Sequence, residues 1–187
     1  FSFNSFKDLT IGVDAIKIQT YTPETMTIDC DNKWFQVRVN PNWKGRTLYQ
    51  LYQMAYTPWK WQPELKKLAE SYGVPLFSTA YNESSVDFLE EMGVSTYKVA
   101  SFEITDSELL KKIASTKKPV IISRGMATLK ELKAAISTLR KYGTPSIAIL
   151  HCVSSYPARP EEMNLATIPD IKKRFPDAAG FEDALSK

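Results

Sequence analysis

Short apolar runs rich in β-branched residues recur along this chain, and turn residues bound each of them. The runs are continuous rather than alternating, which is typical of strands that are buried on both faces of a parallel sheet. The pattern predicts five clear strands and a weaker sixth, at residues 15–19, 74–78, 96–100, 119–123, 146–151 and 178–181.

Segments with helical periodicity separate these runs. Apolar residues three or four positions apart mark two of the segments, at Val86, Leu89 and Met92 and at Leu129, Leu132, Ile136 and Leu139. This spacing places the apolar side chains on one face of a helix, which can then pack against the sheet. We expect these two helices to end before Gly93 and Gly143, because glycine readily adopts the left-handed backbone that closes a helix.

Two helix starts have the sequence of a capping box, in which a hydroxyl residue and a glutamate three positions later satisfy free backbone N–H groups. They are Thr105 with Glu108 and Thr128 with Glu131. The tripeptide at residues 82–84, Asn-Glu-Ser, matches a glycosylation acceptor. Because the sequence shows no secretory signal, we interpret this tripeptide as a helix start instead.

The repeating unit is therefore strand, loop, helix and turn. Equivalent strand positions lie 21, 23 and 28 residues apart, at Phe77, Lys98, Ile121 and Ile149. These lengths suit successive right-handed βαβ crossovers. No glycine-rich phosphate-binding motif follows any strand, which argues against a dinucleotide-binding or P-loop fold. The pattern predicts an α/β fold of the (β/α) TIM-barrel type rather than a doubly wound sheet.

Length limits how much of such a barrel the chain can hold. A closed eight-stranded barrel takes about 250 residues, and this chain has 187. We therefore expect one incomplete barrel domain over residues 1–187, with an aromatic-rich insertion at residues 21–63. The insertion carries all four tryptophans of the chain, Trp34, Trp43, Trp59 and Trp61. Two interpretations of it are open: a satellite core beneath a long loop, or a surface for sugar stacking or dimerisation.

Composition narrows the class of protein. The 24 Lys and Arg residues exceed the 21 Asp and Glu residues by only three, too small and dispersed a surplus to indicate nucleic acid or an anionic membrane. No apolar run approaches the roughly 20 residues of a membrane-spanning helix. Cys30 and Cys152 form neither a disulfide framework nor a paired metal motif, so we expect a cytoplasmic protein. The chain opens without Met or a signal peptide, which suggests a trimmed start or a piece of a longer protein.

The candidate chemistry lies at the carboxyl ends of the predicted strands, where barrels of this type place their active sites. Lysines and hydroxyl side chains together suit a phosphate or a carboxylate, since lysine supplies charge and hydroxyls fix orientation. Several of the hydroxyl groups are equally well explained as helix caps. The polar residues at these ends are Lys17, Gln19, Thr20, Ser78, Thr79, Lys98, Ser101, Glu103, Ser123, Arg124, His151, Ser154 and Tyr156.

Four of these residues have competing interpretations. Lys17 and Lys98 interrupt apolar strands, and the high cost of burying an unpaired ammonium favours a functional role for both. Glu103 either acts in the site or forms a salt bridge with Lys98. His151 is the single histidine of the chain, and we interpret it as a packed or hydrogen-bonded residue rather than a metal ligand.

Six sequence blocks at these positions resemble the N-terminal barrel domain of the sialic acid synthase family. In family order they are AIKIQT at 15–20, FST at 77–79, YKVASFE at 97–103, IISRGMAT at 121–128, HCVSSYP at 151–157 and EEMNL at 161–165. Within that family, the pseudaminic acid synthase branch is the most similar, through residues 19–29, 43–45 and 55–59. The insertion is then a feature of this branch.

The resemblance implies that phosphoenolpyruvate condenses with an open-chain acetamido sugar to give a nonulosonic acid and phosphate. It assigns phosphoenolpyruvate binding to Lys17, Thr79, Lys98, Ser101, Ser123 and Ser154. It places Gln19, Glu103 and Tyr156 against the sugar, with Lys98 and Glu103 as the catalytic pair. It also implies a carbohydrate-biosynthetic transferase with no nucleic acid or membrane partner.

Some features of the family have no counterpart in the sequence. The family uses a divalent metal, Mn²⁺ or Mg²⁺, but Ala184 occupies the position of one metal-binding histidine, and no residue of this chain is assigned as a metal ligand. The acidic motif of the family's first strand and the C-terminal antifreeze-like domain are also absent, and the family's homodimer would need that domain. Arg124 replaces a threonine, so it either adds a phosphate contact or blocks the site.

Three functional alternatives therefore remain at the level of sequence. One is a truncated or degenerate homologue that is not catalytic and acts as an interaction partner. Another is a synthase of the same family for N-acetylneuraminic or legionaminic acid. The third is an unrelated barrel aldolase in which Lys98 forms a Schiff base, a reaction that a desolvated strand lysine can support.

Overall fold

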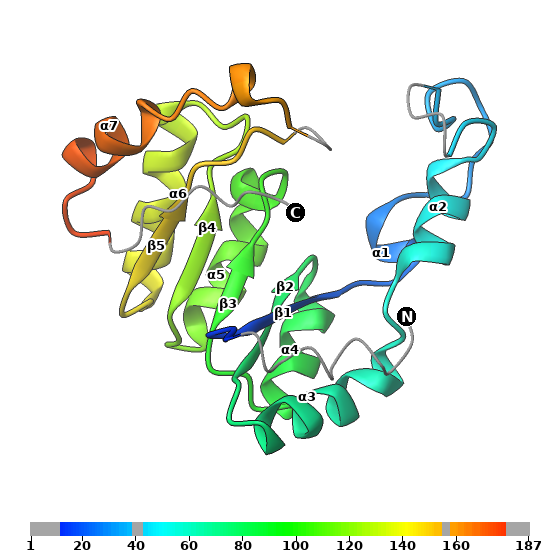
Figure 1. Ribbon diagram of the computed structural model, residues 1–187, viewed down its shortest axis with the longest axis horizontal. Coiled ribbons are helices and arrows are strands. Elements are labelled where there is room, and N and C mark those ends of the chain that lie inside the picture. The colour runs from blue at the N-terminus through cyan, green and yellow to red at the C-terminus, as the bar shows by residue number, and fades with distance from the viewer. Residues whose placement is uncertain (1–11, 39–42, 155–157, 179–187) are drawn as a thin grey trace.

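The fold is built around a sheet of five parallel strands whose order in the sheet follows the sequence. A computed structural model describes residues 12–38, 43–154 and 158–178. Figure 1 shows the strands side by side, with the segment that holds α1 and α2 standing to one side of the sheet. The strands are β1 (Ile16–Thr20), β2 (Leu76–Ala80), β3 (Tyr97–Val99), β4 (Val120–Ser123) and β5 (Ile147–Leu150).

Helices follow the strands as the periodicity predicts, and each strand–helix–strand step makes a parallel neighbour. The helices after β1 are α1 (Pro23–Met26), α2 (Leu48–Ala55), the 3₁₀ turn η2 (Trp59–Trp61) and α3 (Gln62–Ser71). The remaining helices are α4 (Glu83–Glu91), η3 (Glu103–Thr105), α5 (Ser107–Ser115), α6 (Leu129–Tyr142), η4 (Pro160–Glu162) and α7 (Thr167–Arg174). In the described ranges, no helix is long and apolar enough to cross a bilayer.

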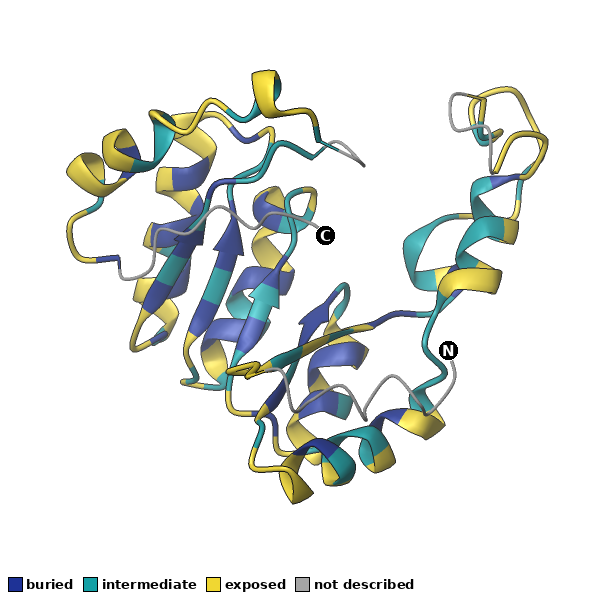
Figure 2. Ribbon diagram, in the orientation of Figure 1, coloured by how far each residue is buried: buried dark blue, intermediate teal, exposed yellow. Residues whose placement is uncertain are grey.

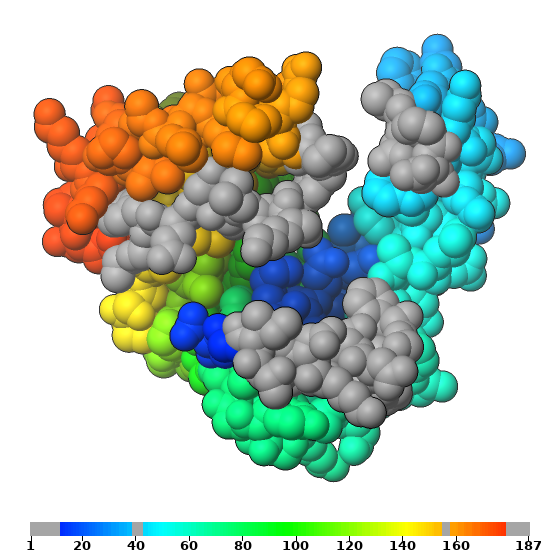
Figure 3. All heavy atoms as spheres, in the orientation of Figure 1, coloured from blue at the N-terminus to red at the C-terminus, as the bar shows by residue number. Residues whose placement is uncertain are grey.

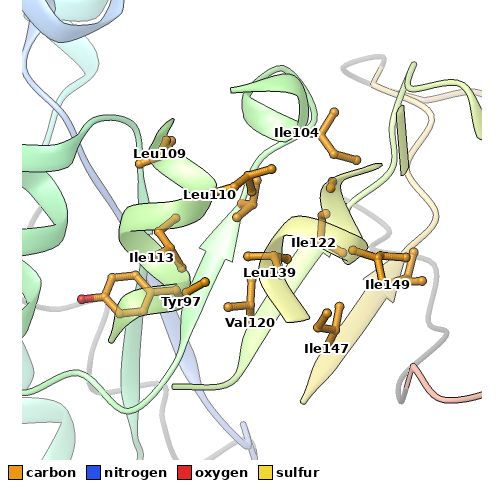
Figure 4. Close-up of a cluster of buried hydrophobic side chains, with 14 of the residues drawn as sticks. Tyr97, Ile104, Leu109, Leu110, Ile113, Val120, Ile122, Leu139, Ile147 and Ile149 are labelled. Carbon is orange, nitrogen blue, oxygen red and sulfur yellow. The ribbon is translucent and has the colours of Figure 1, made fainter. Parts of the chain in front are cut away.

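The hydrophobic core lies between one face of the sheet and the helices that cover it (Figure 4). Tyr97, Ile122 and Ile149 project from three neighbouring strands and are fully buried. Leu110 and Leu139 meet them from α5 and α6. Burying a large aliphatic side chain stabilises a fold by about 1.5–3 kcal/mol, so this layer holds the strand ends in place.

The opposite face of the sheet is only half buried (Figure 2). Residues alternate between buried and intermediate along β3, β4 and β5, and Lys98, Ile121 and Ala148 have intermediate exposure. The continuous apolar runs predicted burial on both faces. In the described residues this holds for the helix-covered face, while the other face borders a cavity.

The five clear strands are confirmed, and every boundary lies within two residues of the expected one. The weak sixth strand is not confirmed at its first residue, because Ala178 lies in a bend. Its remaining positions, 179–181, lie outside the described residues.

Both predicted helix ends are found. The helix before Gly143 closes on that residue in the left-handed region, at φ 109°, and Gly93 follows α4 with φ 68°. Asn82 caps α4 by accepting a hydrogen bond from the Ser85 N–H, which confirms the interpretation of this tripeptide as a helix start.

One of the two predicted capping boxes is confirmed and the other is wrong. Thr128 caps α6 and pairs with Glu131. Thr105, however, belongs to the 3₁₀ turn η3, so α5 begins one residue later than expected. Its cap is Asp106, which accepts hydrogen bonds from the N–H groups of Glu108 at 3.1 Å and Leu109 at 3.0 Å.

We expect Asp106→Ala to lower the free energy of unfolding by about 1 kcal/mol, the usual cost of losing a helix cap. Thr105→Ala should change it by less than about 0.5 kcal/mol, because its side chain is exposed and caps nothing. Urea unfolding of both variants measures the difference. Equal losses would contradict the assignment of Asp106 as the cap.

The aromatic insertion has parts that match each of its two interpretations. Trp59 packs inward, with its ring stacked on Phe88 at a centroid distance of 4.8 Å. Trp34 is 78% exposed, and Trp43 is 43% exposed. The segment therefore contains a small packed core at its return to the sheet and presents other aromatic side chains outward.

Candidate active site

A cavity of about 780 Å³ lies at the carboxyl ends of the strands. Figure 3 shows the molecule hollowed between the insertion and the segment that carries η4 and α7, with β1 at the base. Residues from every strand end and from the insertion line it. The cavity is thus built jointly by the sheet and by the chain inserted after β1.

Strand register creates a row of polar side chains along the cavity floor. Gln19 on β1 pairs with Thr79 on β2, and Thr79 pairs with Lys98 on β3. Because paired residues of parallel strands point to the same face, these three side chains share the cavity side. Lys17 lies two residues before Gln19, and Ser123 lies two residues beyond the partner of Lys98 on β4, so both belong to the same face.

Lys98 is the cation at the centre of this row. Its ammonium donates a hydrogen bond to the Ser123 hydroxyl at 2.7 Å. Burial, and then the nearby charge of Lys17, lower the pKa of Lys98 from 10.5 to about 8. Removal from water also lowers the pKa of Lys17, whose side chain faces the cavity. A bound anion would stabilise the charged form of both lysines, so this pair is suited to bind one.

Glu103 lies in η3 and lines the same cavity as the two lysines. Burial raises the pKa of its carboxyl group, and hydrogen bonding to its own backbone and the charge of Lys98 offset part of the effect. Its Oε2 atom is buried and has no hydrogen-bond partner. The salt bridge with Lys98 that the sequence left open is not formed between these two described residues.

Ser101 and Ser154 meet over Gly125, in the loop after β4. A Cβ atom at Gly125 would lie 2.3 Å from the Ser101 Cβ and 3.0 Å from the Ser154 Oγ. Gly125 has φ +47° and Ser154 has φ 59°, so both adopt left-handed backbone. Because glycine has no side chain, the Ser101 and Ser154 side chains can lie close to the backbone of Gly125.

Aromatic side chains form the other wall of the cavity. The Gln19 side chain donates from Nε2 to the Tyr81 hydroxyl at 2.6 Å. Tyr21 packs edge-on against both Tyr81 and Tyr52, at centroid distances of 5.4 and 5.8 Å. Burial raises the pKa of Tyr81, so its hydroxyl stays protonated and can donate into the cavity.

The structure brings nearly all predicted site residues together. Those that line the cavity are Lys17, Gln19, Thr79, Lys98, Ser101, Glu103, Ser123 and Ser154. Tyr156 lies outside the described residues, as does Ala184. Thr20 and Ser78 are the exceptions among the described hydroxyl residues, because both are fully buried on the helix-covered face, where their hydroxyls are hydrogen-bonded to each other at 2.7 Å.

Arg124 and His151 lie away from the cavity lining. The charge of Arg124 acts on Asp170 of α7, where it adds to the stronger effect of Arg174 in lowering the pKa of that carboxyl. The two predicted roles of Arg124, a phosphate contact or a block, therefore stay predictions. His151 is buried and its Nε2 donates to the Met163 carbonyl at 2.6 Å, which confirms that it is a packed, hydrogen-bonded residue.

Sequence reasoning missed Tyr81, Cys152, Trp43 and Tyr52, all of which line the cavity. Tyr81 and Cys152 directly follow strand ends, so the rule that selected Thr79 could have found them. Trp43 and Tyr52 lie in the insertion, and no local signal indicates which of its aromatic residues face the sheet.

The described residues do not fit a divalent metal. They contain no group of three or more His, Cys, Asp or Glu side chains arranged to hold one. We therefore derive no step through a metal ion.

Comparison with known proteins decides the family. The sequence profile of the NeuB family matches residues 7–185 of this chain. The chain belongs to the NeuB family. Its NeuB relatives include the pseudaminic acid synthases of Campylobacter jejuni, 38% identical, and Helicobacter pylori, 39% identical, each over 172 residues. In both cases 92% of this chain is matched to 50% of the relative, so the chain spans about half the length of the relatives it matches.

Two solved structures share the fold of this chain over more than nine-tenths of its length. The spore coat polysaccharide biosynthesis protein SpsE of Bacillus subtilis is 33% identical with a TM-score of 0.76, covering 96% of this chain and 47% of that one. The N-acetylneuraminic acid synthetase of Leptospira borgpetersenii, solved with citrate, is 28% identical with a TM-score of 0.75, covering 91% and 53%.

Proposed function

We propose that the five-stranded sheet is an arc of a (β/α) barrel and lies within the stretch of about strands 2 to 7 of eight. Support comes from the parallel, sequential strand order and from the gathering of polar residues at one end of the strands. Barrels of this class build their active sites at that end. The half-buried face of the sheet would then be the barrel interior.

We further propose that the protein to which this chain belongs condenses phosphoenolpyruvate with an open-chain acetamido sugar, giving a nonulosonic acid and phosphate. The observation that carries the proposal is that one cavity gathers two kinds of side chain. Its lysines and hydroxyls suit an anion of high charge, while its tyrosines, Trp43 and the Gln19 amide suit a sugar with apolar substituents.

In the condensation, C3 of the enol bonds to the sugar aldehyde carbon, and the aldehyde oxygen takes up a proton. Water then adds to C2, and the C2–O bond to phosphate breaks. Lys17 and Lys98 would hold the phosphate and carboxylate charges, with hydroxyl bonds from Thr79, Ser101, Ser123 and Ser154. Such fixed donors stabilise the charge that develops on the substrate oxygens without reorganising.

Glu103 is the group best suited to move the proton. Its carboxyl has a pKa raised by burial and an unpartnered Oε2 in the cavity, so it is suited to exchange a proton with the aldehyde oxygen. Gln19 and, from the resemblance, Tyr156 would orient the sugar hydroxyls.

A 2,4-diacetamido sugar of the pseudaminic acid type is the proposed substrate. Identity to the two pseudaminic acid synthases is 38–39%, against 34% to the N,N'-diacetyllegionaminic acid synthase of Legionella pneumophila. The alternative sugars of the family differ in stereochemistry, so the shape of the aromatic wall would determine which of them binds.

The test is a phosphate-release assay on the purified protein with phosphoenolpyruvate, Mn²⁺ and either 2-acetamido or 2,4-diacetamido sugars. We expect release that depends on the diacetamido sugar. Binding of phosphoenolpyruvate without any release would favour the non-catalytic homologue. Borohydride trapping of a carbonyl substrate on Lys98, whose lowered pKa suits a Schiff base, would favour the aldolase.

A further inference from the structure

Gln62 is a fully buried amide outside the cavity, at the first turn of α3. A buried amide is costly unless its polar atoms are paired. Here both ends are paired: Oε1 accepts from the Thr20 hydroxyl at 2.7 Å, and Nε2 donates to the carbonyls of Gln19 at 3.3 Å and Thr57 at 3.1 Å. The amide thus joins the end of β1 to the returning end of the insertion.

A second donor from the same turn reinforces this connection. Trp59, three residues before Gln62, donates from its indole N–H to the Tyr21 carbonyl at 3.0 Å. The backbone from Gln19 to Tyr21 is therefore held at two carbonyls by side chains that lie at the end of the insertion.

That backbone carries the aromatic wall. The Gln19 side chain reaches Tyr81, and the Tyr21 ring contacts both Tyr81 and Tyr52 of α2. Gln62 itself is not among the residues that line the cavity. Any rotation of the Gln19 peptide would move the Gln19 amide and the Tyr21 ring together, while Lys98 on β3 and its partner Ser123 on β4 would stay in place.

We propose that Gln62 is a positioning residue that sets the sugar-binding wall of the cavity, and that it acts through the carbonyls of Gln19 and Thr57. The sugar as ligand rests on the proposed function. The anchoring itself does not, because it concerns only the backbone of β1 and of the insertion.

Gln62→Met tests the proposal, since methionine has a similar shape and no donors. We expect the affinity for a 2,4-diacetamido hexose to fall about tenfold, while the affinity for phosphoenolpyruvate changes less than twofold, both measured by calorimetry. Amide hydrogen exchange in residues 20–22 and 57–59 of the free protein should quicken at least tenfold.

Thr20→Val is the matched control. It removes the two hydrogen bonds of the Thr20 hydroxyl, with Gln62 and Ser78, but leaves both Nε2 donations in place. It should therefore lower the melting temperature without the faster local exchange or the selective loss of sugar affinity. Gln62→Met with unchanged exchange, or with both ligands weakened equally, would overturn the positioning role. If the wild type binds phosphoenolpyruvate but no acetamido sugar, the proposed sugar substrate fails, and the exchange contrast between the two variants decides the role of Gln62.

Discussion

Lys98→Met is expected to weaken phosphoenolpyruvate binding by at least about 100-fold, because a charge-assisted hydrogen bond to a desolvated anion is lost. The same change should raise the free energy of unfolding by roughly 1–3 kcal/mol at pH 7. The reason is that burial disfavours the charged form of Lys98 in the folded protein, which lowers its pKa to about 8. Calorimetry and urea unfolding measure the two effects.

The pH dependence follows with a definite sign. The folded pKa of Lys98 lies below the unfolded value, so its cost to stability is complete below about pH 8 and disappears as pH rises toward 10.5. The stability advantage of Lys98→Met should shrink over that range, and the affinity of the wild type for phosphoenolpyruvate should fall above pH 8. Lys133→Met, on the exposed face of α6, removes the same charge and should do neither. If Lys98→Met were less stable than the wild type at pH 7, the buried ammonium of Lys98 would not destabilise the folded protein.

Gly125→Ala is expected to lower the free energy of unfolding by about 2–4 kcal/mol and phosphoenolpyruvate affinity by at least about tenfold. A methyl group there would lie 2.3 Å from the Ser101 Cβ, an atom that cannot move without its backbone. Both Ser101 and Ser154 would be pushed from the cavity wall. Urea unfolding and calorimetry on the same preparation measure the two losses.

Gly93→Ala separates crowding from backbone strain. Gly93 also has positive φ, 68°, but a Cβ there meets nothing within 4 Å. Its substitution should cost only about 1 kcal/mol, the strain of left-handed backbone, and leave ligand affinity unchanged. Equal losses of stability and affinity at the two glycines would mean that the close approach of Ser101 and Ser154 to Gly125 is unimportant.

Much of the fold could be predicted from local pattern. The strands were located because apolar β-branched runs and turn residues are local signals, and α6 because its apolar spacing and the Thr128 cap agree. Thr105 misled because a capping box is a short motif, whereas the choice between it and Asp106 depends on the turn η3 that the preceding loop forms.

For the candidate site, too, local sequence signals predicted one part and tertiary contacts decided the other. The sequence alone determined which residue types reach the strand ends, since strand ends can be counted from the pattern, and the family motifs fix Lys17, Lys98 and Glu103 among them. Only the tertiary structure decided that Thr79 faces the cavity while its neighbour Ser78 faces the helices, because a shift of one residue in register exchanges the two faces. It also decided that Tyr52 and Gln62, which come from an insertion without periodicity, lie against β1. Long-range hydrogen bonds such as that from Gln62 to Gln19 join residues 43 positions apart, and no local pattern in the chain specifies such contacts.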